Sequence, residues 1–499
     1  MQRIRMVRIA PAAFALLSGC TGSAQGPQGG GSSQAISAAT GEAPYVRQTE
    51  VGGRLPASDQ QYGSIEGSRL KGYVEELAGI ARHYRDHGHP QFWGRIIGTE
   101  ADADTAQWML QKFRALEMSD VREQVIDLPP QWMPRSWSVA ASAGGKTLEL
   151  PTAQPTYAAV GTPAEGVDLE AVYVGLGSDA DLALSRDVRG KAAFFYSTDL
   201  TSRHVGVADE AVRRLGERGA AAIFIIQGIP GNLRTQFYPV QSKIPTFTVG
   251  QRDGLAMRDL IGAHAKGPAP RVRVRLDTQM APNLKTATIW GSLPGTTDET
   301  MFVVAHRDGW FDAANDNGTG VATLIGIAEY FSKVPASQRR RTITFLGTTG
   351  HHNSGANSGL WFSEHPEVFA KAALLINCEH TGAVQTGHFN LRSVNAPAPS
   401  TWYASGKRLA GIVMNALDTF GVPTYPESGT RPGGEIGRYF QFAPSVQVMS
   451  SGFVWHSDQE TLASISTTGL EAVTRAYAKI VAGVDSVDLK ELRELQHTQ

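Results

Sequence analysis

The sequence predicts an α/β protein whose main domain is interrupted by a β-rich module. Its 499 residues exceed what one compact core accommodates, so more than one domain is expected. Apolar runs typical of strands alternate with helical spacing near both ends of the mature chain, whereas the middle contains short β-like runs separated by Gly and Asp turns. We therefore expect a discontinuous domain of residues 66–130 and 280–499, interrupted by an insert at 131–279.

The N-terminus carries an export signal. A basic segment precedes a short apolar one that ends in Leu17-Ser-Gly-Cys20, which resembles a bacterial lipobox. We expect residues 1–20 to be a lipoprotein signal peptide, Cys20 to be lipidated, and 21–65 to be a flexible tether. An ordinary signal peptide with a chance cysteine is the alternative. Thr21 after the cysteine favours a lipid-anchored protein of the bacterial cell envelope, at the outer membrane.

The remaining elements follow from hydrophobic spacing. Helices are predicted at 68–84, 106–116 and 320–331, and one helix is predicted inside the insert at 208–217. A strand at 121–128 ends before Pro129-Pro130, because proline cannot donate to a sheet ladder. After Asn283, further strands are predicted near 287–291, 301–305, 342–346, 373–378 and 445–449.

Charge and cysteine content exclude some classes of protein. The 46 basic and 47 acidic residues give a formal net charge of −1, so no basic footprint predicts nucleic-acid binding. If Cys20 is lipidated, Cys378 is the one remaining thiol and no intrachain disulfide can form. We expect Cys378 to be a small core residue.

A candidate metal site follows the strand at 301–305. His306 and Asp308 lie at its end, and Asp316 follows after a Gly/Asn-rich turn. Ligands of open α/β sheets bind at the carboxyl ends of strands, and imidazole and carboxylate are common ligands of first-row metals. The alternative is a solvated His/Asp turn.

Several motifs together resemble the co-catalytic zinc exopeptidases, over roughly residues 66–480. They are Ile97-Gly-Thr-Glu100, Gly190-Lys-Ala, Arg218-Gly-Ala-Ala-Ala-Ile, Asn283 before a strand, and His306-Arg-Asp-Gly-Trp. The branch that is most similar contains glutamate carboxypeptidase and the transferrin receptor, which carry an inserted protease-associated (PA) domain. The resemblance implies a three-layer sandwich with a mixed central sheet, a PA-like insert, and one or two zinc ions, although another first-row metal is possible.

The resemblance also implies roles for individual residues. His306 and Glu379 would bind the first metal, His352 and His456 the second, and Asp316 both. Asp308 would hold the imidazole of His306 and fix its tautomer.

The sequence departs from the family at one pair of positions. His351 and His352 stand where the family has two glutamates, a general base and a ligand of the second metal. His351 is the candidate base, since a neutral imidazole accepts a proton near pH 7. Glu435 is an alternative acid/base, and a solvent-facing loop is the alternative for the His351-His352 pair.

These features favour an exported metal-dependent hydrolase that cleaves a peptide or other amide bond. A non-catalytic binding protein on the same scaffold, as the transferrin receptor is in this superfamily, is the main alternative. A non-hydrolytic metal protein is a third. The expected partners are a peptide or small amide substrate and, through the lipid anchor only, a membrane; the sequence leaves the oligomeric state open.

Overall fold

The computed structural model describes residues 54–184, 187–198, 207–240, 242–353, 356–389, 392–426, 431–450 and 452–494. The expected signal peptide, Cys20 and nearly all of the expected tether lie outside these residues. No helix in the described part of the chain is both long and apolar enough to cross a membrane.

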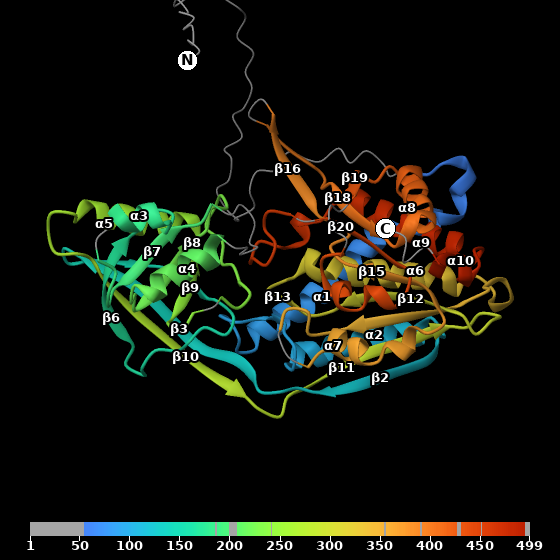
Figure 1. The fold of residues 1–499 in the computed structure, drawn as a ribbon, viewed down its shortest axis with the longest axis horizontal. Coiled ribbons are helices and arrows are strands. Elements are labelled where there is room, and N and C mark those ends of the chain that lie inside the picture. The colour runs from blue at the N-terminus through green and yellow to red at the C-terminus, as the bar shows by residue number, and fades with distance from the viewer. Residues whose placement is uncertain are drawn as a thin grey trace, which may run out of the picture. The chain divides into compact units, whose positions relative to one another are not determined.

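An eight-stranded mixed sheet is the centre of the main domain (Figure 1). Its four middle strands, β14-β12-β15-β20, are parallel, whereas β11 and β2 on one side and β18 on the other add in antiparallel fashion. The edge strand β19 is parallel to β18. In sheet order the strands are β19 (Thr424–Pro426), β18 (Ser400–Ala404), β20 (Ser445–Ser450), β15 (Ala372–Cys378), β12 (Thr300–His306), β14 (Thr342–Thr348), β11 (Lys285–Leu293) and β2 (Ser119–Asp127).

Helices cover both faces of this sheet, which gives three layers. Successive residues of β12 show the division, because Val303 and Ala305 belong to one core while Phe302 and Val304 belong to another. The first core is closed by α1 (Gly67–Asp86), α2 (Glu100–Ala115), α6 (Gly320–Ser332), α8 (Gly406–Phe420) and α9 (Thr467–Asp485). The second is closed by α7 (Ser358–Glu364) and the short turns η4 (Pro366–Phe369), η5 (Glu435–Arg438) and η6 (Phe440–Phe442). The predicted α/β class with a mixed sheet is confirmed.

Residues between β2 and β11 form a second eight-stranded sheet. Its order is β4-β3-β10-β6-β7-β8-β9-β5, in which β6 to β9 are parallel and the long pair β3/β10 is antiparallel (Figure 1). The strands are β3 (Gln131–Ala143), β4 (Lys146–Glu149), β5 (Gln154–Pro155), β6 (Val167–Tyr173), β7 (Ala192–Tyr196), β8 (Ala222–Ile226), β9 (Thr246–Val249) and β10 (Arg271–Ala281). Its helices are α3 (Asp179–Leu184), α4 (Val207–Glu217) and α5 (Gln251–Ala263).

The insert and the main domain share a hydrophobic core. Trp93, Trp310 and Phe311 of the main domain belong to the same buried cluster as Trp132 and Tyr157 of the insert.

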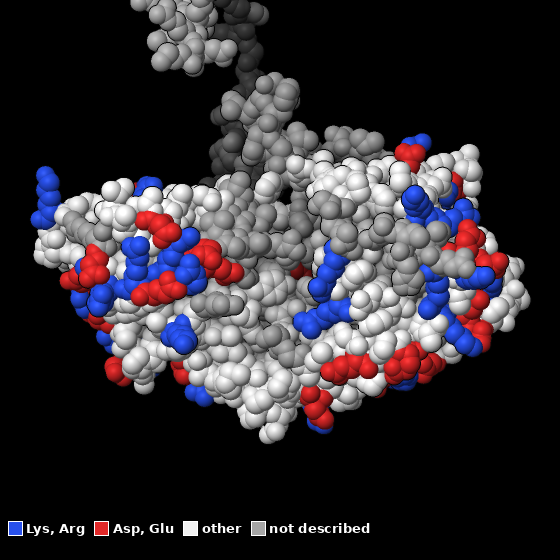
Figure 2. All heavy atoms as spheres, in the orientation of Figure 1, with Lys and Arg blue, Asp and Glu red and all other residues white. Residues whose placement is uncertain are grey.

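The main domain also contains two two-stranded sheets, β1/β13 and β16/β17, and a last short helix, α10. Their bounds are β1 (Gly94–Arg95), β13 (Gly309–Trp310), β16 (Val384–Phe389), β17 (Arg392–Pro397) and α10 (Leu489–Glu494). On the face drawn in Figure 2, acidic and basic side chains are interspersed without a large area of one sign.

Candidate metal centre

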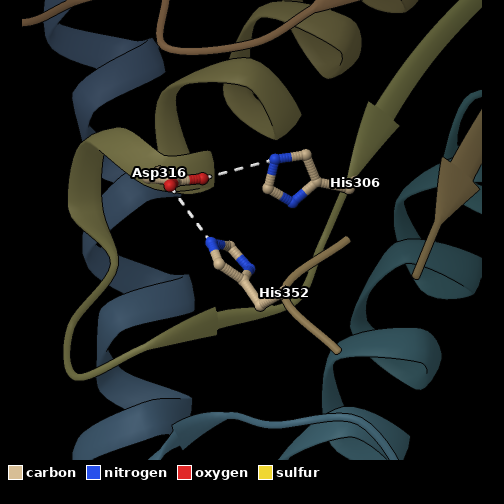
Figure 3. Close-up of side chains that lie close together, drawn as sticks. All are labelled: His306, Asp316 and His352. Atoms are coloured by element: carbon tan, nitrogen blue, oxygen red, sulfur yellow. Dashed lines mark hydrogen bonds and ion pairs between the residues drawn. The ribbon is translucent and has the colours of Figure 1, made fainter. Parts of the chain in front are cut away.

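Asp316 lies at the centre of a buried histidine cluster. Its Oδ1 atom is 3.3 Å from His306 Nε2 and 3.1 Å from His380 Nε2. Its Oδ2 atom is 3.1 Å from His352 Nε2 and 2.8 Å from His456 Nε2. Figure 3 shows the two oxygens facing His306 and His352, which approach from different segments. One carboxylate is therefore placed between two pairs of imidazoles.

The sheet topology explains this convergence. His306 is the last residue of β12, and His352, His380 and His456 follow the ends of β14, β15 and β20. These four strands are parallel neighbours, so their carboxyl ends meet at one edge of the sheet. Asp316 comes from the turn η2 (Ala314–Thr319) that leads into α6 and faces the same edge.

Asp308 holds the ring of His352 from the side opposite Asp316. Its Oδ2 accepts hydrogen bonds from the backbone N–H of His352 at 3.0 Å and from Nδ1 of the same ring at 3.1 Å. Its Oδ1 accepts from the backbone N–H of His351 at 3.3 Å and is 3.6 Å from His306 Nδ1. With Nδ1 of His352 donating to Asp308, Nε2 is left to face Asp316. Asp308 thus orients His352 more directly than His306.

A second buried carboxylate, Glu460, joins two of the loops. It accepts the backbone N–H groups of Asn315 at 3.0 Å and Asp316 at 2.5 Å, and that of His456 at 2.7 Å. Burial and the nearby charge of Asp316 raise the pKa of Glu460 to about 8. Glu460 was not expected from the sequence, because its role depends on backbone N–H groups of Asn315 and Asp316 that are distant in the chain.

Buried Arg95 fixes the loop between β12 and Asp316. It donates to the carbonyl oxygens of Arg307 at 2.9 Å, Asp312 at 2.8 Å and Ala313 at 3.0 Å. Burial lowers its pKa to about 10, so it remains protonated at neutral pH. Arg307 is buried too, and it pairs with Asp102 at the start of α2.

The cluster strongly favours positive charge. Burial lowers the pKa of His352, but Asp316 and Asp308 outweigh this effect and raise it to about 9. Burial likewise opposes ionisation of Asp316, yet His380 and His352 hold its pKa well below the ordinary value. By contrast, burial lowers the pKa of His456 to about 3. An ionised carboxylate among imidazoles, one of them neutral, is an arrangement that a bound cation would stabilise.

Unpaired buried atoms show where such a cation fits. Among the described side chains, His306 Nε2, Asp316 Oδ1 and both ring nitrogens of His380 are buried without a hydrogen bond. Each buried polar atom without a partner costs about 1–3 kcal/mol. Two of these atoms, His306 Nε2 and His380 Nε2, lie 3.3 Å and 3.1 Å from a third, Asp316 Oδ1. Nitrogen and carboxylate donors suit zinc. The residues present therefore fit a metal centre.

Glu379 belongs to an adjoining set. Ligand atoms of His306, His351 and Glu379 lie within 4.8 Å of one another, as do those of His306, Asp316 and His352. The ring of His351 stacks on that of His306 with centroids 4.3 Å apart, and His351 Nε2 is 3.8 Å from Glu379 Oε1. Of the five ligands expected from the sequence, four surround Asp316 or are Asp316 itself. Glu379 lies beside the base candidate His351.

Glu435, the other acid/base candidate, lies next to Glu379. Its backbone N–H donates to Glu379 Oε2 at 3.1 Å, and its own carboxylate accepts from Thr348 Oγ1 at 2.6 Å. Burial raises the pKa of Glu435 to about 7. The carboxylates of Glu379 and Glu435 therefore both lie near the edge of the sheet where the histidines meet.

The insert closes one side of the cluster. The ring of Tyr238 lies 5.1 Å from that of His456 and 6.0 Å, nearly parallel, from that of His352. Tyr157 accepts a hydrogen bond from Asn353 Nδ2 at 2.6 Å, and the backbone N–H of Gln236 donates to the carbonyl of His456 at 2.9 Å. The insert thus contacts the two loops that carry His352 and His456.

Comparison with known proteins agrees with this geometry. Residues 288–481, which include every histidine of the cluster, match the model of peptidase family M28. Aminopeptidase YwaD of Bacillus subtilis (strain 168) is 24% identical over 256 residues, a match that spans half of this chain and half of that relative.

Solved structures extend the likeness in fold beyond residues 288–481. A zinc aminopeptidase from Bacillus subtilis is 15% identical and superposes with a TM-score of 0.60, covering 85% of this chain and 97% of its own. A peptidase M28 precursor from Shewanella amazonensis SB2B is 18% identical with a TM-score of 0.67, covering 86% of this chain and 96% of its own. At these identities the likeness establishes the fold, in agreement with the zinc-exopeptidase-like class expected from the sequence.

Proposed function

We propose that the protein is a zinc-dependent hydrolase of peptide or similar amide bonds, with Asp316, His306, His352 and His456 as metal ligands. The observation that carries the proposal is the position of Asp316, whose two carboxylate oxygens each face imidazole nitrogens in a buried cluster. The match to peptidase family M28 and the likeness to zinc aminopeptidases support the reaction class.

Zinc bound in this cluster would polarise the scissile carbonyl and lower the pKa of a water molecule. Asp308 orients the His352 ring, as the 3.1 Å contact at Nδ1 requires. Burial and the neighbouring His306 lower the pKa of His351 to about 4. Its ring is therefore neutral at pH 7 and has a free lone pair for a proton, but it is a weaker base than an ordinary imidazole. Glu379, 3.8 Å away, then stabilises the protonated ring.

The insert is proposed to be PA-like and to restrict the substrate. Tyr238 and Trp310, whose ring centroids are 5.3 Å apart, form an aromatic wall next to His352 and His456. Such a wall favours a substrate with an apolar side chain and leaves little room for a folded protein. The pair His351-His352 in the place of two glutamates distinguishes this protein within the proposed glutamate carboxypeptidase-like branch.

The location is proposed from the sequence. The lipobox-like Leu17-Ser-Gly-Cys20 supports an exported protein that is anchored in the bacterial cell envelope through Cys20, at the outer membrane. A small peptide that reaches this compartment would be the natural substrate class.

The proposal is tested with the purified chain and a panel of aminoacyl and peptidyl amides. Activity should be lost on treatment with a chelator and return with zinc. Asp316→Asn should lose both zinc and activity, and His351→Ala should keep zinc but lose about 10²–10⁴-fold in rate, the usual contribution of a general base. Asp312→Asn, in the same loop but paired with Arg82 at 2.9 Å, is the control.

Two outcomes would contradict the proposal. Bound zinc without turnover on any amide would favour the non-catalytic binding protein, which the missing glutamate pair already makes the main rival. Full activity of His351→Ala would assign the proton transfer to another group, and Glu435 is then the next candidate.

A further inference from the structure

We propose that His380, rather than Glu379, is the ligand that completes the first metal site beside His306. The inference rests on the proposed metal centre and deepens it, because it makes Asp316 a bridge between two pairs of imidazoles. It departs from what the resemblance to zinc exopeptidases implied for position 379.

His380 lies as close to Asp316 as the other imidazoles do. His380 Nε2 is 3.1 Å from Asp316 Oδ1, the same oxygen that His306 Nε2 approaches to 3.3 Å. The opposite oxygen has an equivalent pair, His352 and His456. His380 therefore occupies, on one side of the carboxylate, the place that His456 occupies on the other.

The buried ring of His380 lacks hydrogen-bond partners. The side chain is 1% exposed, and both of its ring nitrogens are buried without a hydrogen bond among the described residues. A structural core histidine normally donates or accepts at one nitrogen at least. Here Nε2 is aimed at a carboxylate oxygen that also lacks a hydrogen bond, which points to an occupant shared by the two atoms.

The backbone at His380 has an unusual conformation that directs the ring toward Asp316. Residue 380 has φ +50°, a left-handed conformation that is uncommon for residues other than Gly, and that Asn, Asp and His adopt more often than other side chains. The conformation is held by the N–H of His380, which donates to Asn317 Oδ1 at 3.2 Å, and by its carbonyl, which accepts from Ser450 N at 2.9 Å and Ser450 Oγ at 2.7 Å. Unfavourable backbone conformations concentrate at functional sites, where the surroundings enforce them.

The carboxylate of Glu379 is directed elsewhere. Its Oε2 accepts from Asn377 Nδ2 at 2.6 Å and from the backbone N–H of Glu435 at 3.1 Å. Gly434 packs against the same carboxylate so closely that a Cβ there would be 2.1 Å from Oε2. Glu379 directly follows β15, in the alternation that places Leu375 in the core on the η5 side of the sheet. Its remaining oxygen faces His351.

Two rival sites are therefore separable by substitution. A metal at His306, Asp316 and His380 requires residue 380, whereas a metal at His306, His351 and Glu379 requires residue 379. His380→Asn is the first variant, because asparagine tolerates φ near +50° and cannot replace the ring. Glu379→Gln is the matched control, since it keeps the side-chain length and an acceptor for Asn377.

The readouts are zinc content by elemental analysis, zinc affinity by competition with a chromophoric chelator, and the visible spectrum of the cobalt(II)-loaded protein. His380→Asn should lose one equivalent of zinc, or bind it more than about 100-fold more weakly, because loss of a direct ligand should exceed the 10–100-fold cost of losing an outer partner. Its cobalt spectrum should also change. Glu379→Gln should keep the wild-type stoichiometry.

A second variant keeps the test valid if His380→Asn folds poorly. His380→Gly relieves the left-handed backbone and leaves a hole the size of a ring, so added imidazole should restore zinc binding. An unchanged zinc content and cobalt spectrum in both His380 variants, or loss of zinc in Glu379→Gln alone, would overturn the inference while leaving the proposed metal hydrolase intact. A wild-type protein that binds no zinc would instead overturn the proposed function itself.

Discussion

Substitution of Asp308 tests quantitatively how the ring of His352 is held in place. In the structure, its Oδ2 accepts two hydrogen bonds from His352 and its Oδ1 accepts one from the N–H of His351. Asp308→Asn has one acceptor oxygen in place of two. Whichever way the amide turns, its NH₂ group faces an N–H donor, so at least one bond is replaced by a repulsive contact.

The expected cost follows from these contacts. Hydrogen bonds to a charged group contribute about 1.5–3 kcal/mol each, and one lost bond corresponds to about 10–100-fold in affinity, which is also the usual effect of removing the carboxylate partner of a metal-bound histidine. Zinc competition with a chromophoric chelator measures the change directly. Asp312→Asn, which removes a carboxylate from the same loop, should change zinc affinity by less than about 3-fold. Equal affinity of Asp308→Asn and the wild type would refute the assigned role.

Three further predictions concern the surroundings of the site. Tyr157→Phe removes the acceptor for Asn353 Nδ2 and should lower zinc affinity or turnover several-fold without unfolding the protein, as chelator competition and circular dichroism can check. Arg95→Met leaves three loop carbonyls without their buried donor and should lower the free energy of unfolding by about 3 kcal/mol or more, measured by denaturant titration. Cys20→Ala should release the protein from membranes, and unchanged fractionation would mean that Cys20 is not the anchor.

The buried strands of the main domain were readable because they are continuous apolar runs. Residues 301–305 and 342–346 fall inside β12 and β14, and the helix expected at 320–331 matches α6 within one residue. Strand β3 was not expected, since its exposed polar residues and Pro134 obscure a pattern whose pairing with β10 shifts register at Asp277 and Thr278. Helix α5 was missed as well. Its Gly254 lowers helix propensity, and a Cβ there would be 2.3 Å from Ile226, so close packing on β8 explains the glycine.

The site was only partly predictable for a related reason. Residues at the ends of parallel strands could be expected to meet, and His306, Asp316, His352 and His456 do lie together. Which of two adjacent residues points at Asp316 depends on the backbone at the end of β15. Glu379 and His380 differ by one position, and the left-handed conformation at 380 that aims the ring is not visible in the sequence.

The distribution of charge explains how a histidine-rich centre could hold dications. Two zinc ions would bring four positive charges, against which the proposed ligands, four neutral imidazoles and Asp316, would supply one negative charge. Two further buried carboxylates, Asp308 and Glu379, contact the ligand His352 and the neighbouring His351. Despite burial, neighbouring histidines hold the pKa of both carboxylates below the ordinary value, so both are ionised at neutral pH. The carboxylates of Asp308 and Glu379 thus keep their negative charge near the site without being direct ligands.

This arrangement predicts the choice of metal. Imidazole nitrogen suits zinc, copper, nickel and cobalt, whereas manganese and magnesium prefer oxygen ligands. With one carboxylate among the direct ligands, the apoprotein should bind zinc and cobalt(II) at least about 100-fold more tightly than manganese(II), in keeping with the general affinity order of nitrogen sites. Competition titrations with each ion test this. Comparable manganese affinity would mean that carboxylates such as Glu379 reach the metal directly, and that the imidazole pairs around Asp316 do not define the centre.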